Sequence, residues 1–206
     1  MKLEKSKTYE NLARAFAGEC QARTRYEFIE YGARYNGYKA VAEIIDKVVF
    51  QEFNHARMIY TAIHGSKEPE ISNIPINAGF PFKEKWDLIE NLRLASEDEK
   101  DDAKFYTEAI KTAEKEGFSD IVSLFSQIKE VELHHSKLFL ELHNQMKDKT
   151  LYKKAKAVKW ICPDCGRVYV DTEAPEECPL CKAKQGSFEI LLPAEFTSYQ
   201  TRSTRK

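Results

Sequence analysis

Residues 41–63 read VAEIIDKVVFQEFNHARMIYTAI, a segment in which apolar side chains recur every three or four positions. One glutamate and one histidine, Glu52 and His55, fall in the middle of the same stripe. Side chains at this spacing share one face of an α-helix, so the segment predicts a helix over 38–64 that ends at Gly65. Its buried face would then carry an acid and a base, which need a partner inside the protein because an unpaired buried charge is costly.

Three further segments repeat this pattern, over residues 6–35, 83–116 and 119–147, and Ser119 is the expected N-cap of the last one. Short turns join the first two predicted helices and the last two. Residues 65–82 connect the two pairs and carry three prolines, which do not suit a helix interior. Two helical hairpins linked by one long crossover are typical of the ferritin-like four-helix bundle, so we expect a mainly α fold.

Each of the four predicted helices carries a glutamate near the centre of its apolar stripe, and in two of them a histidine follows three positions later. Residues i and i+3 lie on one helix face, so each Glu-x-x-His pair can offer an oxygen and a nitrogen to one metal ion. This ligand set is typical of di-iron and di-manganese carboxylate bundles, whereas acids paired with bases at the helix edges are the alternative interpretation. The candidate ligands are Glu19, Glu52, His55, Glu99, Glu132 and His135. The remaining histidines, expected at the surface or at helix ends, are His64, His134 and His143.

The charge of the chain is balanced, because 32 lysines and arginines against 33 acids give a formal net charge of -1. We therefore expect neither nucleic acid nor an anionic membrane surface as a partner. The first residues, MKLEKSKTYE, lack the apolar stretch of a signal peptide, and no segment reaches the roughly 18 consecutive apolar residues of a membrane span. These features predict a cytoplasmic protein.

Four of the five cysteines form two Cys-x-x-Cys pairs with twelve residues between the pairs. Two such pairs can hold one metal ion in a tetrahedron of thiolates, and zinc and iron fit this site equally well. The lysine-rich stretch before them, residues 145–160, is expected to be a solvated helix end and a linker. Residues 168–170 are expected to form a strand. The cysteines are Cys162, Cys165, Cys178 and Cys181.

These patterns divide the chain into three parts. We expect the four-helix bundle over residues 1–155, the four-cysteine metal domain over 156–195 and a flexible tail over 196–206.

Three motifs resemble those of the rubrerythrin family: GECQARTRY at residues 18–26, EFNHA at 52–56 and ELHH at 132–135. The segment around the four cysteines resembles rubredoxin. The resemblance implies a di-iron centre, oxo-bridged when oxidised, held by the six bundle residues, and one further iron held by the four thiolates. It also places two tyrosines beside the di-iron site, Tyr26 and Tyr106, although ordinary core aromatics would fit the same positions.

The third predicted helix departs from the family, which has GExxE followed by a Met-Tyr-Pro element, whereas this chain has EDEKDDAKFYTEA at residues 97–109. Alignment from the preceding residues places the two carboxylates on Glu99 and Asp102. Alignment back from the downstream tyrosine places them on Asp98 and Asp101. Heptad phase favours Glu99 as a ligand and leaves Asp102 as an uncertain seventh, and it predicts that Asp98 and Asp101 point away from the site.

The resemblance implies a peroxidase that reduces hydrogen peroxide to water at the di-iron centre in oxidative-stress defence. Electrons would pass through the four-thiolate iron from rubredoxin or from an NAD(P)H-dependent reductase. The family also implies a homodimer in which that iron approaches the di-iron site of the neighbouring subunit. An iron-handling bundle with ferroxidase activity is the second hypothesis, and a zinc-ribbon binding protein with a structural di-metal core is the third.

Overall fold

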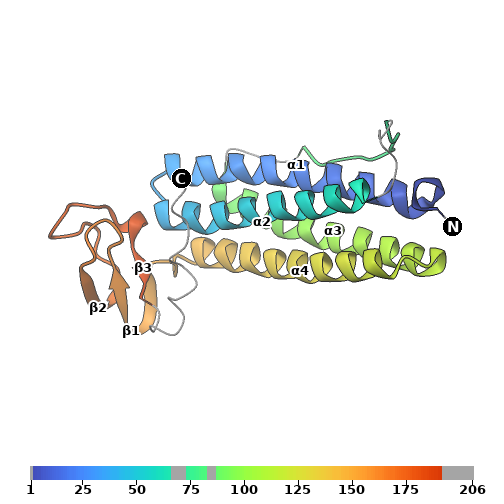
Figure 1. Cartoon of the computed structure of the whole chain (residues 1–206). Coiled ribbons are helices and arrows are strands. Elements are labelled where there is room, and N and C mark those ends of the chain that lie inside the picture. The colour runs from blue at the N-terminus through green and yellow to red at the C-terminus, as the bar shows by residue number, and fades with distance from the viewer. Residues whose placement is uncertain (1, 66–72, 83–86, 192–206) are drawn as a thin grey trace.

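The computed structural model describes residues 2–65, 73–82 and 87–191, which form four long helices followed by a small three-stranded sheet (Figure 1). The helices are α1 (Lys7–Tyr35), α2 (Lys39–His64), α3 (Leu88–Glu116) and α4 (Ser119–Lys147), preceded by a 3-10 turn, η1 (Leu3–Lys5). Helices α1 and α2 form one hairpin and α3 and α4 form the other, and residues 73–82 of the connection between the hairpins run along α1. The expected ferritin-like bundle is therefore confirmed. None of the helices in the described part of the chain is long and apolar enough to span a membrane.

Local signals set the ends of several helices. Ser6 caps α1, because its side chain accepts a hydrogen bond from the backbone amide of Tyr9. Asp87 caps α3 in the same way, through two backbone amides of the first turn. Gly117 ends α3 with a φ of 83°, a left-handed conformation that glycine adopts without steric strain.

Two helix starts differ from the expected ones. Phe118 occupies the N-cap position of α4 and Ser119 is its first helical residue, so the predicted Ser119 cap is wrong. The Phe118 side chain packs against the core, and this packing sets where the helix begins. Helix α3 begins at Leu88, directly after Asp87, later than the expected residue 83; residues 83–86 lie outside the described part of the chain.

Two apolar clusters fill the bundle and leave a polar layer between them. The cluster on the side of the α1–α2 turn includes Tyr26, Ile29, Val41, Ile45, Leu92, Phe139 and Leu142. The cluster toward the opposite end includes Leu12, Ala15, Ile59, Tyr106, Ala113, Phe125 and Ile128. On every helix the predicted ligands lie between these two sets in the sequence, so the candidate site is a polar layer closed above and below by packed apolar side chains.

The small domain is an antiparallel sheet in the order β2-β1-β3, with strands β1 (Lys153–Ile161), β2 (Val168–Glu173) and β3 (Glu189–Ile190) and a 3-10 turn, η2 (Gln185–Ser187). The linker predicted over residues 145–160 is therefore wrong in its second half, where the chain forms β1. Trp160 is buried opposite Tyr169 of β2, while most of the lysines of β1 point to solvent. A single buried aromatic residue among lysines does not produce the alternation of apolar and polar residues by which a strand is predicted from sequence.

The small domain lies at the end of the bundle, beside the turn between α1 and α2 (Figure 1). Gly186 approaches the turn so closely that a Cβ atom on it would lie 1.8 Å from the carbonyl oxygen of Gly37. An ion pair between Lys39 and Asp164 joins the same two parts. Because β1 begins at Lys153, the domain boundary expected at residue 155 falls inside this strand, and the expected tail over 196–206 lies outside the described residues.

Candidate metal centres

The six predicted bundle ligands come from all four helices and meet in one buried layer. The exposed fraction of each of these residues is 5% or less. Ligand atoms of Glu19, Glu52, His55 and Glu132 all lie within 4.8 Å of one another, and those of Glu52, Glu99, Glu132 and His135 form a second such group. Two of the residues, Glu52 and Glu132, belong to both groups. This arrangement offers two adjacent metal positions bridged by two carboxylates.

Each histidine points its Nδ1 atom at several carboxylates at once. The His55 Nδ1 atom lies 3.1 Å from Glu132 and 3.3 Å from Glu19. The His135 Nδ1 atom lies 2.8 Å from Glu52 and 3.2 Å from Glu132. A single ring nitrogen donates one hydrogen bond, so several oxygens converging on it fit a shared cation better than a network of hydrogen bonds.

Charge and unsatisfied oxygens also favour metal ions. Four buried glutamates face only two histidines in these groups, so full ionisation would leave uncompensated negative charge even with both imidazoles protonated. The Oε1 atom of Glu99 is buried and accepts no hydrogen bond from any residue that the structure describes. Two divalent cations would neutralise the carboxylates and take up this free oxygen, and the mixed oxygen and nitrogen donors suit iron, manganese or zinc.

Without metal, some of the carboxylates and both histidines of this layer are protonated. Burial, reinforced by the nearby Glu132 carboxylate, raises the pKa of Glu19 well above its usual value, and burial also raises the pKa of Glu99. Burial alone would lower the pKa of His55 and His135, but the hydrogen bonds that their rings donate to Glu132 and neighbouring carboxylates raise both pKa values to about 12. Burial opposes the ionisation of Glu52, yet hydrogen bonds with His135 and His55 lower its pKa to about 2. Metal binding would displace these protons.

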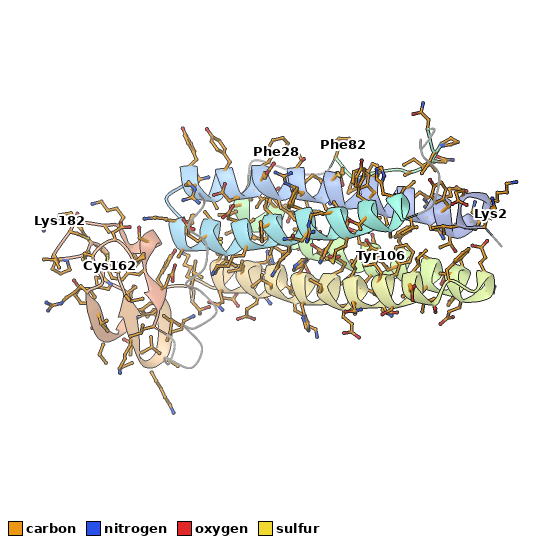
Figure 2. The ribbon with its side chains drawn as sticks, in the orientation of Figure 1. Lys2, Phe28, Phe82, Tyr106, Cys162 and Lys182 are labelled. Carbon is orange, nitrogen blue, oxygen red and sulfur yellow. The ribbon has the colours of Figure 1, made fainter. Side chains whose placement is uncertain are left out.

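Two tyrosines and one glutamine surround the ligands. The Tyr106 hydroxyl donates a hydrogen bond to Glu19, inside the bundle (Figure 2). Tyr26 is also buried, and burial together with the nearby Glu99 raises its pKa. The Nε2 atom of His135 lies 2.8 Å from the amide oxygen of Gln51, which fixes the proton on Nε2 and leaves Nδ1 free for a metal.

Gln51 was not found from the sequence. It lies on an exposed part of α2, directly before Glu52, and contacts α4 across the bundle. A pattern along one helix does not tell which residue of a neighbouring helix it meets, so the sequence carries no signal for this contact.

The structure separates the two registers proposed for α3. Glu99 lies in the second ligand group, and Asp102 is half-buried beside it, outside both groups. Burial, with a smaller contribution from Glu132, raises the pKa of Asp102 to about 7. Asp101 is exposed and pairs with Lys104. Asp98 also lies outside both groups, but it is not at the surface, because its side chain is buried against α1.

The three histidines expected outside the site lie outside both ligand groups, but only two of them are exposed. His64 and His134 are exposed. His143 is buried, and its Nδ1 atom lies 2.8 Å from the carbonyl oxygen of Ile89, so it joins α4 to the start of α3. It lies three positions after Leu140 and one after Leu142, near the edge of the apolar stripe, where side-chain burial depends on the neighbouring helix.

The four cysteines of the small domain form one group, which includes Cys162, labelled in Figure 2. Their sulfur atoms all lie within 4.8 Å of one another, and the closest cross-pairs, Cys162 with Cys181 and Cys165 with Cys178, are 3.5 Å and 3.7 Å apart. These separations exceed the roughly 2.05 Å of a disulfide, and all four are free thiols. The group fits one tetrahedral metal ion.

Hydrogen bonds prepare one of these sulfurs for the thiolate form. Burial opposes ionisation of Cys178, but the Tyr169 hydroxyl, 3.3 Å from its sulfur, and the backbone amides of Cys181 and Leu180 lower its pKa to about 6. The amide of Lys182, whose φ is 69°, bonds back to the carbonyl of Cys178 and closes this turn. The hydrogen bonds of this turn therefore stabilise a thiolate that can bind a metal ion.

Comparison with known proteins agrees with both sites. The family model described as rubrerythrin matches residues 10–87 and 90–164, and the model for the rubredoxin-like domain of rubrerythrin matches residues 160–189. The rubrerythrin of Clostridium perfringens is 34% identical over 190 residues, covering 92% of this chain and 96% of that protein. The rubrerythrin of Porphyromonas gingivalis is 34% identical over 187 residues, covering 90% of each.

Solved structures show the same fold. A partially reduced nigerythrin superposes with a TM-score of 0.59 at 24% identity, covering 91% of this chain and 90% of that one. A bacterioferritin from Desulfovibrio desulfuricans matches with a TM-score of 0.57 at 19% identity, covering 69% of this chain and 81% of that one. The bundle thus carries the candidate di-iron site, and the small domain carries the four-cysteine iron site.

Proposed function

The chain belongs to the rubrerythrin family, and on this basis we propose that it is a non-haem iron peroxidase that reduces hydrogen peroxide to water in oxidative-stress defence. The observation that carries the proposal is the pair of ligand groups that share Glu52 and Glu132. Glu19 and His55 would complete one iron position, and Glu99 and His135 would complete the other. Two adjacent metal positions suit a reaction that consumes two electrons at one bond.

The reaction takes hydrogen peroxide, two electrons and two protons and gives two water molecules. Bound iron would supply the two electrons, one from each ion, and act as a Lewis acid toward the peroxide oxygens. The residues of this chain do the rest. The buried glutamates and histidines would hold the two ions, and the Tyr106 hydroxyl holds a proton at Glu19, a ligand of one of the two positions.

The four-cysteine iron would return electrons to the bundle site, one at a time. Zinc in this position is redox-inert and could not take this role. Rubredoxin or an NAD(P)H-dependent reductase would be the electron donor. This assignment rests on the tetrahedral thiolate group and on the match of residues 160–189 to the rubredoxin-like domain of the family.

The distance within one chain favours a homodimer. Glu19 lies sixteen positions before Tyr35, the last residue of α1, which at 1.5 Å per residue corresponds to about 24 Å along the helix. The small domain docks at this end of the bundle, so its cysteines lie far from the ligands of their own chain. Exposed aromatic side chains on α1 and α2, which a second copy could cover, are Phe28, Tyr31, Tyr35, Phe50 and Phe53.

Stopped-flow spectroscopy of the fully reduced, iron-loaded protein tests the function. We expect one equivalent of hydrogen peroxide to oxidise the two bundle irons, and we expect this oxidation to be much faster than that by an equal concentration of dioxygen. With excess peroxide, the visible absorption of oxidised four-thiolate iron should then appear, and it should disappear again when the reductase and NADH are added. Slow reaction with peroxide, combined with fast oxidation by dioxygen and mineral formation beyond two irons per bundle, would show an iron-storage protein instead. A colourless small domain would show that zinc occupies the cysteines.

A further inference from the structure

A cavity lies between α1 and α3, on the side along which the crossover runs (Figure 1). We call it the α1–α3 cavity; its volume is about 280 Å³. The carboxylates Glu19, Glu52 and Glu132 form its inner wall, and residues 78–81 of the crossover line its outer side. The cavity therefore connects the ligand layer with a segment whose first two residues are exposed to solvent.

We propose that the α1–α3 cavity is the entry route by which small, neutral hydroperoxides reach the bundle site; this inference rests on the proposed peroxidase function. The two apolar clusters close the bundle above and below the ligand layer, so a substrate has to enter from the side. The cavity reaches Glu52 and Glu132, the two carboxylates that both ligand groups share. A molecule arriving there would meet both metal positions together.

The size of the cavity limits what it admits. Pockets for drug-sized ligands usually measure about 300–1,000 Å³, whereas one water molecule takes about 30 Å³. The α1–α3 cavity, at about 280 Å³, lies just below the range for drug-sized ligands and holds hydrogen peroxide easily. Half-buried Phe80 of the crossover narrows its outer side.

The lining of the cavity is polar and carries charges of both signs. Six carboxylate residues and two arginines, Arg14 and Arg25, contribute to it. Neutral hydrogen peroxide can exchange hydrogen bonds with these side chains.

Gly18 keeps the route open. It lies on α1 directly before Glu19 and lines the cavity, and a Cβ atom added to it would meet no atom within 4 Å. A larger side chain would therefore grow into free space without moving the helix backbone. Gly32 offers a matched control, because it lies on the same helix, a Cβ there also meets no atom within 4 Å, and it is not part of the lining.

The test compares Gly18→Ala, Gly18→Leu and Gly32→Leu in the full iron-loaded protein. Nitric oxide, a small neutral probe that binds reduced iron, measures entry independently of turnover through the rate of its absorbance change. We expect Gly18→Leu to slow nitric oxide binding and to lower kcat/KM for hydrogen peroxide together, by roughly tenfold, with Gly18→Ala between it and the natural protein. Gly32→Leu should match the natural protein in both measurements, and all three should keep normal iron content.

Phe80→Ala provides a second variant with the opposite expected effect. Shortening this side chain should widen the route, so turnover of cumene hydroperoxide should rise relative to that of hydrogen peroxide. Unchanged nitric oxide binding in Gly18→Leu, or no gain for the bulky substrate in Phe80→Ala, would overturn the route. If the natural protein fails to reduce peroxide but Gly18→Leu still slows nitric oxide binding, the peroxidase function is wrong and the route stands.

Discussion

The guanidinium group of Arg25 lies 2.5 Å from the carboxylate of Asp98, and both side chains are buried between α1 and α3. Asp98 directly precedes the candidate ligand Glu99, so this ion pair ties α3 to α1 next to the metal layer. Arg25 also stands close to the ring of Tyr26, which places a cation beside the aromatic neighbour of Glu99. The pair therefore stabilises the contact between α1 and α3.

We expect Asp98→Asn to lower the free energy of unfolding by about 3 kcal/mol, because it removes the negative charge that neutralises a buried arginine. Urea unfolding of the iron-loaded protein measures this change. Asp101→Asn is the control; its exposed pair with Lys104 should contribute less than about 0.5 kcal/mol. Iron content should stay close to normal in both variants, since neither residue lies in a ligand group. Equal stability of the two variants would contradict the role of the pair.

Glu99→Ala should weaken iron binding by roughly 100-fold or more, because it removes a ligand and leaves the second metal position with fewer anionic oxygens. Asp102→Ala should alter the peroxidase rate but keep near-normal iron content, since Asp102 lies outside both groups. Metal analysis after dialysis against a weak chelator compares the two. Iron loss in Asp102→Ala with normal content in Glu99→Ala would assign the ligands in the opposite way.

Cys178→Ser should abolish turnover driven by NADH and a reductase while sparing the bundle irons, because the two sites share no residue. Chemically reduced protein should still consume one equivalent of peroxide in a single turnover at the natural rate. A steady-state assay measures the reductase-driven turnover, and a single-turnover assay on the same preparation measures the reaction of the bundle irons with peroxide. Normal reductase-coupled turnover in this variant would show that electrons reach the bundle by another path.

Tyr169→Phe should lower the reduction potential of the four-cysteine iron by about 20–60 mV, because the lost hydrogen bond favoured the more electron-rich, reduced form. The phenyl ring keeps the edge contact with Phe188, so the fold of the domain should not change. Tyr152→Phe is a matched control, since that hydroxyl bonds the carbonyl of Gly186 and not a sulfur. A spectroelectrochemical titration that gives the same potential for both variants would rule out the tuning role.

The iron-free protein should become less stable as the pH rises. The pKa values of His55 and His135 are raised to about 12 from 6.5, so their contribution is complete below pH 6.5 and is lost as the pH approaches 12. The raised pKa of Glu19 acts in the same direction. Calorimetry should show Tm falling by roughly 5 °C or more between pH 6.5 and 9. Iron binding should strengthen over the same range, because the ligands must lose their protons. A constant Tm for the iron-free protein would contradict this.

Much of the bundle could be predicted because its signals are local and repeated. Apolar stripes and terminal glycines gave helices close to those observed, and Glu52 and His55 stand in the stripe where the structure buries them. Contacts between helices could not be read in this way. The stripe of α3 does not reveal that Asp98 meets Arg25, nor that of α4 that His143 reaches the backbone of Ile89.

The small domain was harder to predict because its strands are short and mostly exposed. The spacing of the cysteines located the metal site. The sequence of β1 is rich in lysine and has no strand pattern, and the segment forms a strand by pairing with β2. Trp160, the buried aromatic residue of β1, donates its ring N–H to the carbonyl of Asp171 on β2. Long-range pairing of this kind leaves no period in the sequence.

The contact between Gly186 and Gly37 limits how this joint can evolve. The two backbones meet without an intervening side chain, and Gly37 itself has a φ of 83° that favours glycine. Even a methyl group at position 186 would have to push the small domain away from the bundle. Small changes of side-chain size therefore cannot adjust the spacing between the two domains at this position. A single codon change at Gly186 would thus displace the small domain from the bundle, whereas a side chain at Gly37 would strain the turn without meeting the small domain.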